Sequence, residues 1–272
     1  MGYLLLFIVF GLIIFGVWSI FNDIYVYIYD QIKYSLKVRQ PLKNSRRLIL
    51  NQYSAYYKVL PVDKKQAFEK RVQRFIYSKK FISRSSLPVS EAMRVLISAS
   101  AIQLTFGLPE IYLSHFDKIL IYPDSYYSQI TKKYHLGEVN PRAGVILLSW
   151  NHFVHGYADL TDSFNVGLHE MAHAIHFENR IKNEEFDFLN KDALATLNTI
   201  TSREIPKIKN SEPHLLRPYA GTNEYEFFAV SLEYFFEQPK TMSEQHPDLY
   251  QTIAILLRQD PLKLYNFSHP KQ

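Results

Sequence analysis

Residues 169–173 read His-Glu-Met-Ala-His, an HExxH pattern whose side chains could carry out metal-dependent hydrolysis. Histidines four residues apart lie about one turn apart on one face of a helix, so both imidazoles can bind a single Zn²⁺ ion. The glutamate between them can hold the water molecule that such an ion activates. His169 and His173 are therefore candidate zinc ligands, and Glu170 is the candidate catalytic base.

The element that must position these residues is a buried helix predicted over residues 163–180. Asp162 or Ser163 offers a cap at its start. The apolar residues that favour its burial are Val166, Leu168, Ala172 and Ile175. The alternative interpretation is a pair of ordinary surface histidines on this helix.

A catalytic zinc site needs a third protein ligand and leaves its fourth position to water. His176 lies on the same helix face, but a rise of about 10 Å from His169 is too large for one tetrahedral ion. The longer signature HExxHxxGxxH is excluded, because its glycine would fall at His176 and its last histidine at Asn179. The remaining choice is a glutamate from a second helix farther along the chain.

That second helix is predicted over residues 222–237, beginning at the capping residue Thr222. Glu226 stands beside Phe227 there, and a buried carboxylate is costly unless it is paired or binds a metal. Glu226 is the preferred third ligand and Glu224 the alternative, although the helix dipole alone also favours acidic residues in a first turn. Glu233, two turns farther on, could orient a ligand without touching the metal.

Beyond these motifs, the sequence resembles the Mlc titration factor A (MtfA) family of bacterial zinc peptidases. The resemblance covers about residues 60–262 and is carried by residues 90–96, 119–123, 144–150, 165–173, 219–230 and 258–261. The block around Glu226 is also similar to the catalytic domain of anthrax lethal factor. A zinc-dependent peptidase acting on peptide or protein substrates is therefore the function that the resemblance implies.

Carried over residue by residue, the resemblance implies that His169, His173 and Glu226 bind zinc. It also implies that Tyr219, seven residues before Glu226, assists catalysis. His152, His155 and His214 are alternative hydrogen-bond donors for the reaction. The sequence departs from the family at His176, where an Asp is usual, so His176 joins Glu233 as a candidate supporting residue.

A different class of function follows from the family name. The titration factor family is named for binding a transcriptional repressor of sugar uptake. The alternative function is therefore a regulatory protein that binds a partner and has weak or secondary peptidase activity.

The N-terminus predicts a membrane anchor. Residues 3–21 include no charged side chain and, at about 1.5 Å per residue, could cross a hydrocarbon core of about 30 Å. A cleaved signal peptide fits less well, because no Lys or Arg precedes the apolar run and no cleavage site follows it. The expectation is a single transmembrane helix.

Charge then orients this anchor. Residues 31–80 contain 14 Lys or Arg but only Asp63 and Glu69 as acids, and the whole chain has a net charge of +5. The positive-inside rule predicts a single-pass protein of the bacterial inner membrane with its catalytic domain in the cytoplasm. Because the basic residues gather next to the anchor, the charge does not indicate direct nucleic-acid binding.

The expected organisation is a transmembrane anchor over residues 1–30, a basic juxtamembrane segment over 31–60 and a zinc metallopeptidase domain over 61–272. The fold class is α+β and mainly helical, a single zincin-type (gluzincin) domain with a small sheet. Strands are expected over residues 118–122 and 144–150, the second as the edge strand that pairs with substrate. The remaining helices are expected over residues 42–56, 62–79, 88–105, 188–200 and 246–258. The chain has no Cys, which excludes disulfides and cysteine chemistry.

Overall fold

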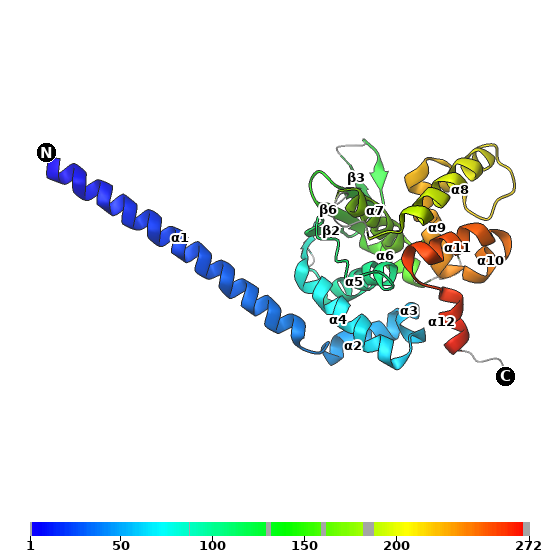
Figure 1. Cartoon of the computed structure of the whole chain (residues 1–272), viewed down its shortest axis with the longest axis horizontal. Helices are drawn as coiled ribbons and strands as arrows, with labels where there is room; N and C mark the ends of the chain where they lie inside the picture. The colour runs from blue at the N-terminus through cyan, green and yellow to red at the C-terminus, as the bar shows by residue number, and fades with distance from the viewer. Residues whose placement is uncertain (1, 87, 129–131, 159–161, 182–187, 269–272) are drawn as a thin grey trace. The chain divides into compact units, whose positions relative to one another are not determined.

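The computed structural model of the chain describes residues 2–86, 88–128, 132–158, 162–181 and 188–268 (Figure 1). The chain divides into two units, Met1–Pro41 and Leu42–Gln272. The second unit includes α2 (Asn44–Tyr53) and α3 (Ala55–Val59), because Leu50, Tyr56 and Tyr57 are buried in its core. The compact second unit begins at Leu42, and the start of the peptidase domain at residue 61 stays a prediction.

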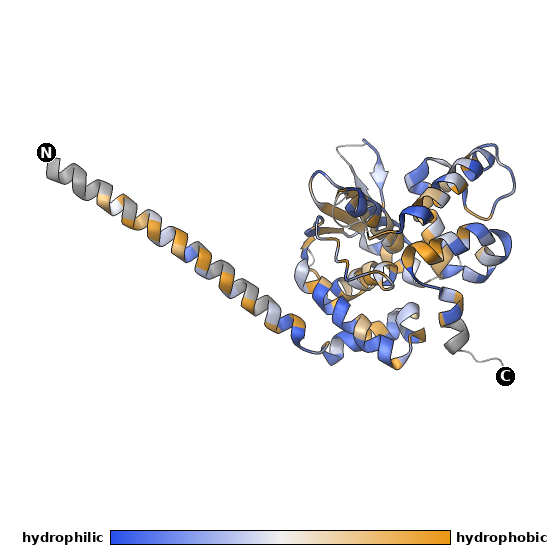
Figure 2. Cartoon of the chain, in the orientation of Figure 1, coloured by the Kyte–Doolittle hydropathy of each residue, from blue (hydrophilic) through white to orange (hydrophobic). Residues whose placement is uncertain are grey.

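The first unit is a single helix, α1 (Gly2–Arg39). The side chains described along it are mostly apolar, and its last turn is basic, with Lys37 and Arg39 (Figure 2). α1 does not end with the apolar run but continues into this charged turn. Side chains of residues 3–9, which belong to the predicted span, lie outside those described.

A search of the described residues finds no helix that is both long and apolar enough to span a bilayer. This finding contradicts the transmembrane helix predicted over residues 3–21. It equally contradicts the predicted single-pass location in the inner membrane and the predicted membrane partner.

The second unit is mainly helical with a small sheet, as predicted. The sheet has the strand order β1-β2-β6-β5. β1 (Lys80–Ser83), β2 (Lys118–Tyr122) and β6 (Val145–Ser149) are parallel, and β5 (Gly137–Asn140) runs antiparallel to β6. Ile119 and Ile121 of β2 alternate with less buried residues, which places them in the core beside Ile146 and Leu148 of β6.

The position of β6 corrects one prediction. The segment at residues 144–150 was expected to be the edge strand, but β6 is paired with β2 on one side and with β5 on the other. β5 stands at the end of the described sheet instead. Its sequence, Gly-Glu-Val-Asn, has little of the β-branched content typical of strands, so the periodicity of the sequence did not indicate it.

α6 and α7 contact this sheet, and the helices expected from the sequence form with shifted ends. α4 spans Val62–Ser78, α5 Glu91–Thr105, α7 Val166–Ile181, α8 Lys191–Lys209, α9 Glu224–Glu237 and α11 Pro247–Leu257. The sequence did not predict β1, α6 (Trp150–Ala158), α10 (Pro239–Gln245), α12 (Pro261–Ser268), the 3₁₀ turn η1 (Pro218–Gly221), or the β3 (Tyr126–Tyr127) and β4 (Tyr134–His135) ribbon.

The helix that carries HExxH lies at the centre of this unit. α7 packs against α5, α9, α6 and the β5–β6 side of the sheet (Figure 1). Residues 166–172 are all buried, and this stretch includes two polar residues, His169 and Glu170. Polar and charged side chains are rarely buried unless they are paired or bind a metal, so the burial of His169 and Glu170 indicates a specific role for them.

Candidate metal centre

Asn165 fixes the start of α7. Its side-chain oxygen accepts a hydrogen bond from the amide of Leu168 at 2.9 Å, and its carbonyl accepts the amide of His169 at 2.9 Å. Asn165 is therefore the cap, rather than Asp162 or Ser163 as predicted. The side chain of Asp162 instead accepts the amide of Phe164 and closes the turn before the helix.

Asn223 performs the same task for α9. Its side-chain oxygen accepts the amides of Tyr225 and Glu226 at 2.9 and 3.0 Å, so the cap falls one residue after the predicted Thr222. The helix packs Phe227 and Phe235 into the core, where both are fully buried. Its opposite face turns Glu226 and Glu233, two turns apart, toward α7.

Three lone-pair atoms from these two helices converge on one point. Nε2 of His169 lies 3.2 Å from Nε2 of His173 and 3.0 Å from Oε2 of Glu226, and the distance between His173 and Glu226 is 3.4 Å. Nitrogen and oxygen ligands about 2.0–2.2 Å from a tetrahedral Zn²⁺ ion stand roughly 3.3–3.6 Å apart. The three spacings are those of a tripod that one small cation can occupy.

The proton on His169 supports this assignment. Nδ1 of His169 lies 2.8 Å from Oε1 of Glu233, a carboxylate oxygen that can only accept, so Nδ1 carries the hydrogen. The lone pair of Nε2 then faces His173 and Glu226. Oε2 of Glu226 is buried and has no hydrogen-bond partner. A cation between these atoms, whether a metal ion or a proton on Nε2, would satisfy the buried oxygen of Glu226.

The electrostatics favour a positive charge at the same point. Burial lowers the pKa of His169, but the carboxylates of Glu226 and Glu233 outweigh it and raise that pKa to about 10. Burial also disfavours the charged form of Glu226 and so raises its pKa. His169 and His173 outweigh this effect and hold the pKa of Glu226 far below its usual range. The raised pKa of His169 reports a negative potential from Glu226 and Glu233 at its ring, and such a potential also attracts a metal ion.

Glu170 lies beside the tripod and under β5. Burial raises the pKa of its carboxyl group, against the pull of His169 and His173. A Cβ atom on Gly137 of β5 would meet Oε1 of Glu170 at 2.4 Å, so this strand can pass so close only because residue 137 has no side chain. Because Gly137 has no side chain, the carboxylate of Glu170 has room to lie next to His169 and His173.

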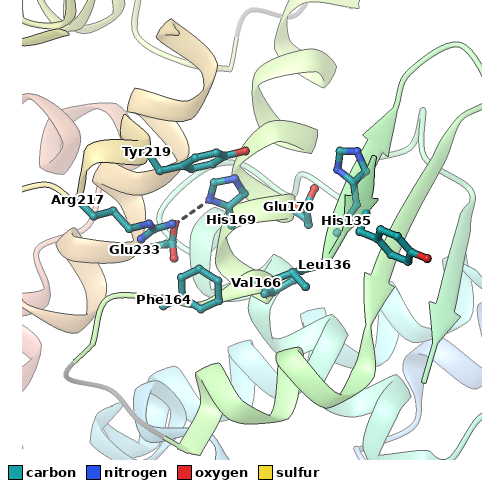
Figure 3. Close-up of a pocket in the computed structure, with 11 residues that line it drawn as sticks. His135, Leu136, Phe164, Val166, His169, Glu170, Arg217, Tyr219 and Glu233 are labelled. Atoms are coloured by element: carbon teal, nitrogen blue, oxygen red, sulfur yellow. Dashed lines mark hydrogen bonds and ion pairs between the residues drawn. The ribbon is translucent and has the colours of Figure 1, made fainter. Parts of the chain in front are cut away.

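A pocket of about 380 Å³ opens beside these residues, lined in part by His169, Glu170 and Tyr219 (Figure 3). Tyr219 comes from η1, and its ring centroid lies 6.0 Å from that of His169. Burial and the nearby carboxylates of Glu226 and Glu170 raise the pKa of Tyr219 to about 12, so its hydroxyl keeps its proton at neutral pH. The predicted Tyr219 thus stands where a donor could reach a bound substrate.

The structure separates the remaining predicted residues from the tripod. Glu224 is exposed, and it lines a different pocket. His176 packs with its ring 5.0 Å from Tyr225 and 5.8 Å from Phe228, and burial lowers its pKa to about 4. His152 contacts the hydroxyl of Ser149, and neither it nor His155 or His214 lines the pocket beside His169.

Two residues that hold the site together, Arg217 and Asn165, were not among the predicted site residues. Arg217 donates to Oε1 of Glu233 at 2.6 Å and also to the carbonyl of Ser163. The backbone amide of Asn165 donates to Oε2 of Glu233 at 2.6 Å. Both oxygens of Glu233 are therefore committed, and Glu233 is held firmly where it orients His169.

A second group, Glu204, His214 and His246, also brings three potential ligand atoms together. Nδ1 of His214 accepts the backbone amide of Leu216 at 3.0 Å, so its proton must sit on Nε2, the nitrogen that faces Glu204. Glu204 already pairs with Lys207 at 3.1 Å and with Arg203 at 2.5 Å. This cluster is suited to internal ion pairing rather than to binding a cation.

Comparison with known proteins places the chain among the enzymes that this geometry suggests. The family of glucose-regulated metallo-peptidases M90 matches residues 30–258, and the chain belongs to that family. It is thus a metallopeptidase, an enzyme class that cleaves peptide bonds with a divalent metal ion.

The chain is also similar in sequence to individual proteins of this kind. Mlc titration factor A of Edwardsiella ictaluri is 27% identical over 229 residues, covering 74% of this chain and 82% of that protein. Mlc titration factor A of Enterobacter sp. is 26% identical over 225 residues, covering 75% and 82%. An uncharacterized protein of Synechocystis sp. is 28% identical over 239 residues, covering 82% and 87%. These matches support the predicted resemblance to the MtfA family.

Proposed function

We propose that the chain is a zinc-dependent peptidase whose metal ion is held by His169, His173 and Glu226. The observation that carries the proposal is the set of three lone-pair atoms 3.0–3.4 Å apart, one of them a buried carboxylate oxygen without a hydrogen-bond partner. Two imidazoles and one carboxylate are a ligand set typical of catalytic zinc, which leaves a further position for water or substrate.

The protein's own groups have distinct tasks in this reaction. A bound zinc ion supplies a Lewis acid that lowers the pKa of water and polarises the scissile carbonyl. Glu170 accepts the proton of the attacking water and passes it to the leaving amine. Tyr219 donates a hydrogen bond to the oxygen on which negative charge develops. Glu233, held by Arg217, keeps His169 in the tautomer whose Nε2 binds the metal.

The substrate segment is expected to bind in an extended conformation along β5. This strand ends the described sheet and passes over Glu170 through Gly137. A peptide that adds a strand to such an edge gains main-chain hydrogen bonds and carries its scissile bond past the base. β5, rather than residues 144–150, is therefore the strand proposed to pair with substrate.

A second candidate function comes from the relatives. Two of them carry the name Mlc titration factor A, which describes capture of a regulator by those proteins. The chain could similarly bind a regulatory protein as its main task, with peptide hydrolysis as a secondary activity. This alternative needs the surface of the second unit but not Glu170 as a base.

Zinc content and peptide hydrolysis of three full-length proteins test the proposal. Wild type should bind one zinc ion and cleave peptides, and Glu170→Gln should keep the zinc but lose turnover by about 10²-fold or more, since general base catalysis is removed. His173→Ala should lose both. A folded wild type that binds no zinc would refute the proposal. Capture of a regulator by a Glu170→Gln protein, combined with negligible hydrolysis by wild type, would favour the second candidate.

A further inference from the structure

Asn165 connects three helices at the start of α7. Its side-chain nitrogen donates to the carbonyl of Gly156 in α6 at 3.1 Å and to Oε1 of Glu237 in α9 at 2.9 Å. Its side-chain oxygen caps α7, and its backbone amide donates to Oε2 of Glu233. Asn165 is 4% exposed, so water cannot readily replace these bonds. A shift of Glu237 would therefore be transmitted through this one residue to Glu233 and to the start of α7.

Glu237 is the last residue of α9, and its position favours a neutral carboxylic acid. Oε2 of Glu237 is buried and has no hydrogen-bond partner among the described residues. The unpaired carbonyl groups at a helix C-terminus carry partial negative charge, which disfavours a carboxylate there. Glu233 stands four residues earlier on the same helix, where a second negative charge is also unfavourable. Three features of the position thus disfavour the ionised form of Glu237.

The neighbouring groups act on Glu237 in both directions. The titratable and charged side chains that face it are those of Tyr157, Asp162, Arg217 and Glu233. Burial raises the pKa of Glu237 to about 8, with the two neighbouring carboxylates acting in the same direction and Asn165 and Arg217 in the opposite one. Tyr157 keeps its proton, because burial raises the pKa of its hydroxyl. Glu237 is thus neutral at pH 7 and gains its charge close to Glu233 as the pH rises.

We propose that Glu237 is a positioning residue for the metal site, which in its neutral form holds Asn165 and so keeps Glu233 in contact with His169. The inference rests on the proposed peptidase function, because the site that Glu237 supports is the zinc site. Deprotonation would place a second carboxylate near Glu233, repel it and compete with it for Arg217. The bond between Glu233 and Nδ1 of His169 would then weaken, and His169 would lose the support that directs Nε2 toward the metal (Figure 3).

Full-length wild type and Glu237→Gln, compared from pH 6 to pH 9, test this coupling through kcat and through zinc affinity in chelator competition. Gln keeps an acceptor for Asn165 but cannot ionise, so the two proteins should agree within about twofold at pH 6. At pH 9 a group with a pKa of about 8 is roughly nine-tenths ionised, so wild type should be about three- to tenfold below Glu237→Gln in both quantities. Because both proteins share the same metal ligands, other effects of pH cancel in this ratio.

The control for this comparison is Glu244→Gln, which changes an exposed residue of α10. It should follow wild type at every pH. A ratio between wild type and Glu237→Gln that stays within about twofold from pH 6 to pH 9 would overturn the proposal.

The role of Glu237 as an acceptor is tested separately at pH 6. Glu237→Ala removes the partner of Asn165 and should lower zinc affinity and kcat by about threefold or more with little change in KM, whereas Glu237→Gln should match wild type. Equal values for Glu237→Ala and Glu237→Gln would overturn the positioning role. Zinc affinity that follows residue 237 in a protein that cleaves no peptide would refute the peptidase function and support the positioning role, so the two failures are distinguishable.

Discussion

Gly137→Ala should abolish most of the activity while leaving the fold intact. The added Cβ would lie 2.4 Å from Cγ and Oε1 of Glu170, whereas carbon atoms in favourable contact stand about 3.5–4.0 Å apart. The carboxylate must therefore move by roughly 1 Å, and a misplacement of that size costs about 10²-fold in rate. Because the obstructing atoms belong to a side chain and not to backbone, the strand can keep its path, and the free energy of unfolding should fall by about 1–3 kcal/mol, the usual cost of overpacking a buried site.

The assay compares kcat, zinc content and thermal unfolding of Gly137→Ala with those of Glu138→Ala, a control in the same strand. Gly137→Ala should bind one zinc ion and lose about 10²-fold in kcat, and Glu138→Ala should remain close to wild type. In a Glu170→Gln background the second change at Gly137 should cost almost nothing more, since both act through one carboxylate. Full activity of Gly137→Ala, or equal losses in both backgrounds, would refute the idea that residue 137 acts by clearing space for Glu170.

Three further outcomes follow from the site. Glu233→Gln keeps an acceptor for His169 but loses the charge that pairs with Arg217, so zinc affinity in chelator competition should fall about 10- to 100-fold; an unchanged affinity would count against the orienting role. Tyr219→Phe should lower kcat by about 10²- to 10³-fold with little effect on stability, because the ring is 49% exposed; kcat at the wild-type level would exclude Tyr219 as the donor. Burial raises the pKa of Glu237 to about 8, above its unfolded value, so wild type loses stability as pH rises from about 4.5 to 8. Urea titrations should show Glu237→Gln gaining about 2–4 kcal/mol relative to wild type across that window, and a constant difference, like that of the exposed control Glu244→Gln, would contradict it.

The residues of the site that lie close together in the sequence could be predicted, because the spacing of residues along a helix determines which side chains share a face. Four-residue spacing alone places His169 and His173 on one face of α7, and an acidic residue inside an aromatic helix pointed to Glu226. The structure brings the side chains of these three residues together. The residues that cap α7 and α9 are Asn165 and Asn223, which differ from the predicted caps by one to three positions. Several neighbouring polar residues can cap a helix equally well, and only the three-dimensional path of the chain selects one.

The non-local part could not be predicted. β5 becomes a strand through its pairing with β6 and not through its own composition, so the edge strand was assigned to the wrong segment. Arg217 is one of many basic residues, and only folding brings it to Glu233. The need for glycine at position 137 likewise arises only in the folded chain, where the side chain of Glu170 lies against it. For the N-terminal helix, the apolar run over residues 3–21 predicts a membrane span, and the described structure contradicts this prediction.

Locating the metal in a crystal of the zinc-loaded full-length protein tests the central claim most directly. Anomalous diffraction at the zinc edge should give one strong peak within about 2.0–2.2 Å of Nε2 of His169, Nε2 of His173 and a carboxylate oxygen of Glu226. The peak should vanish in Glu226→Ala but persist in Glu170→Gln. A peak at Glu204, His214 and His246 instead, or one at the tripod that survives Glu226→Ala unchanged, would contradict the assignment.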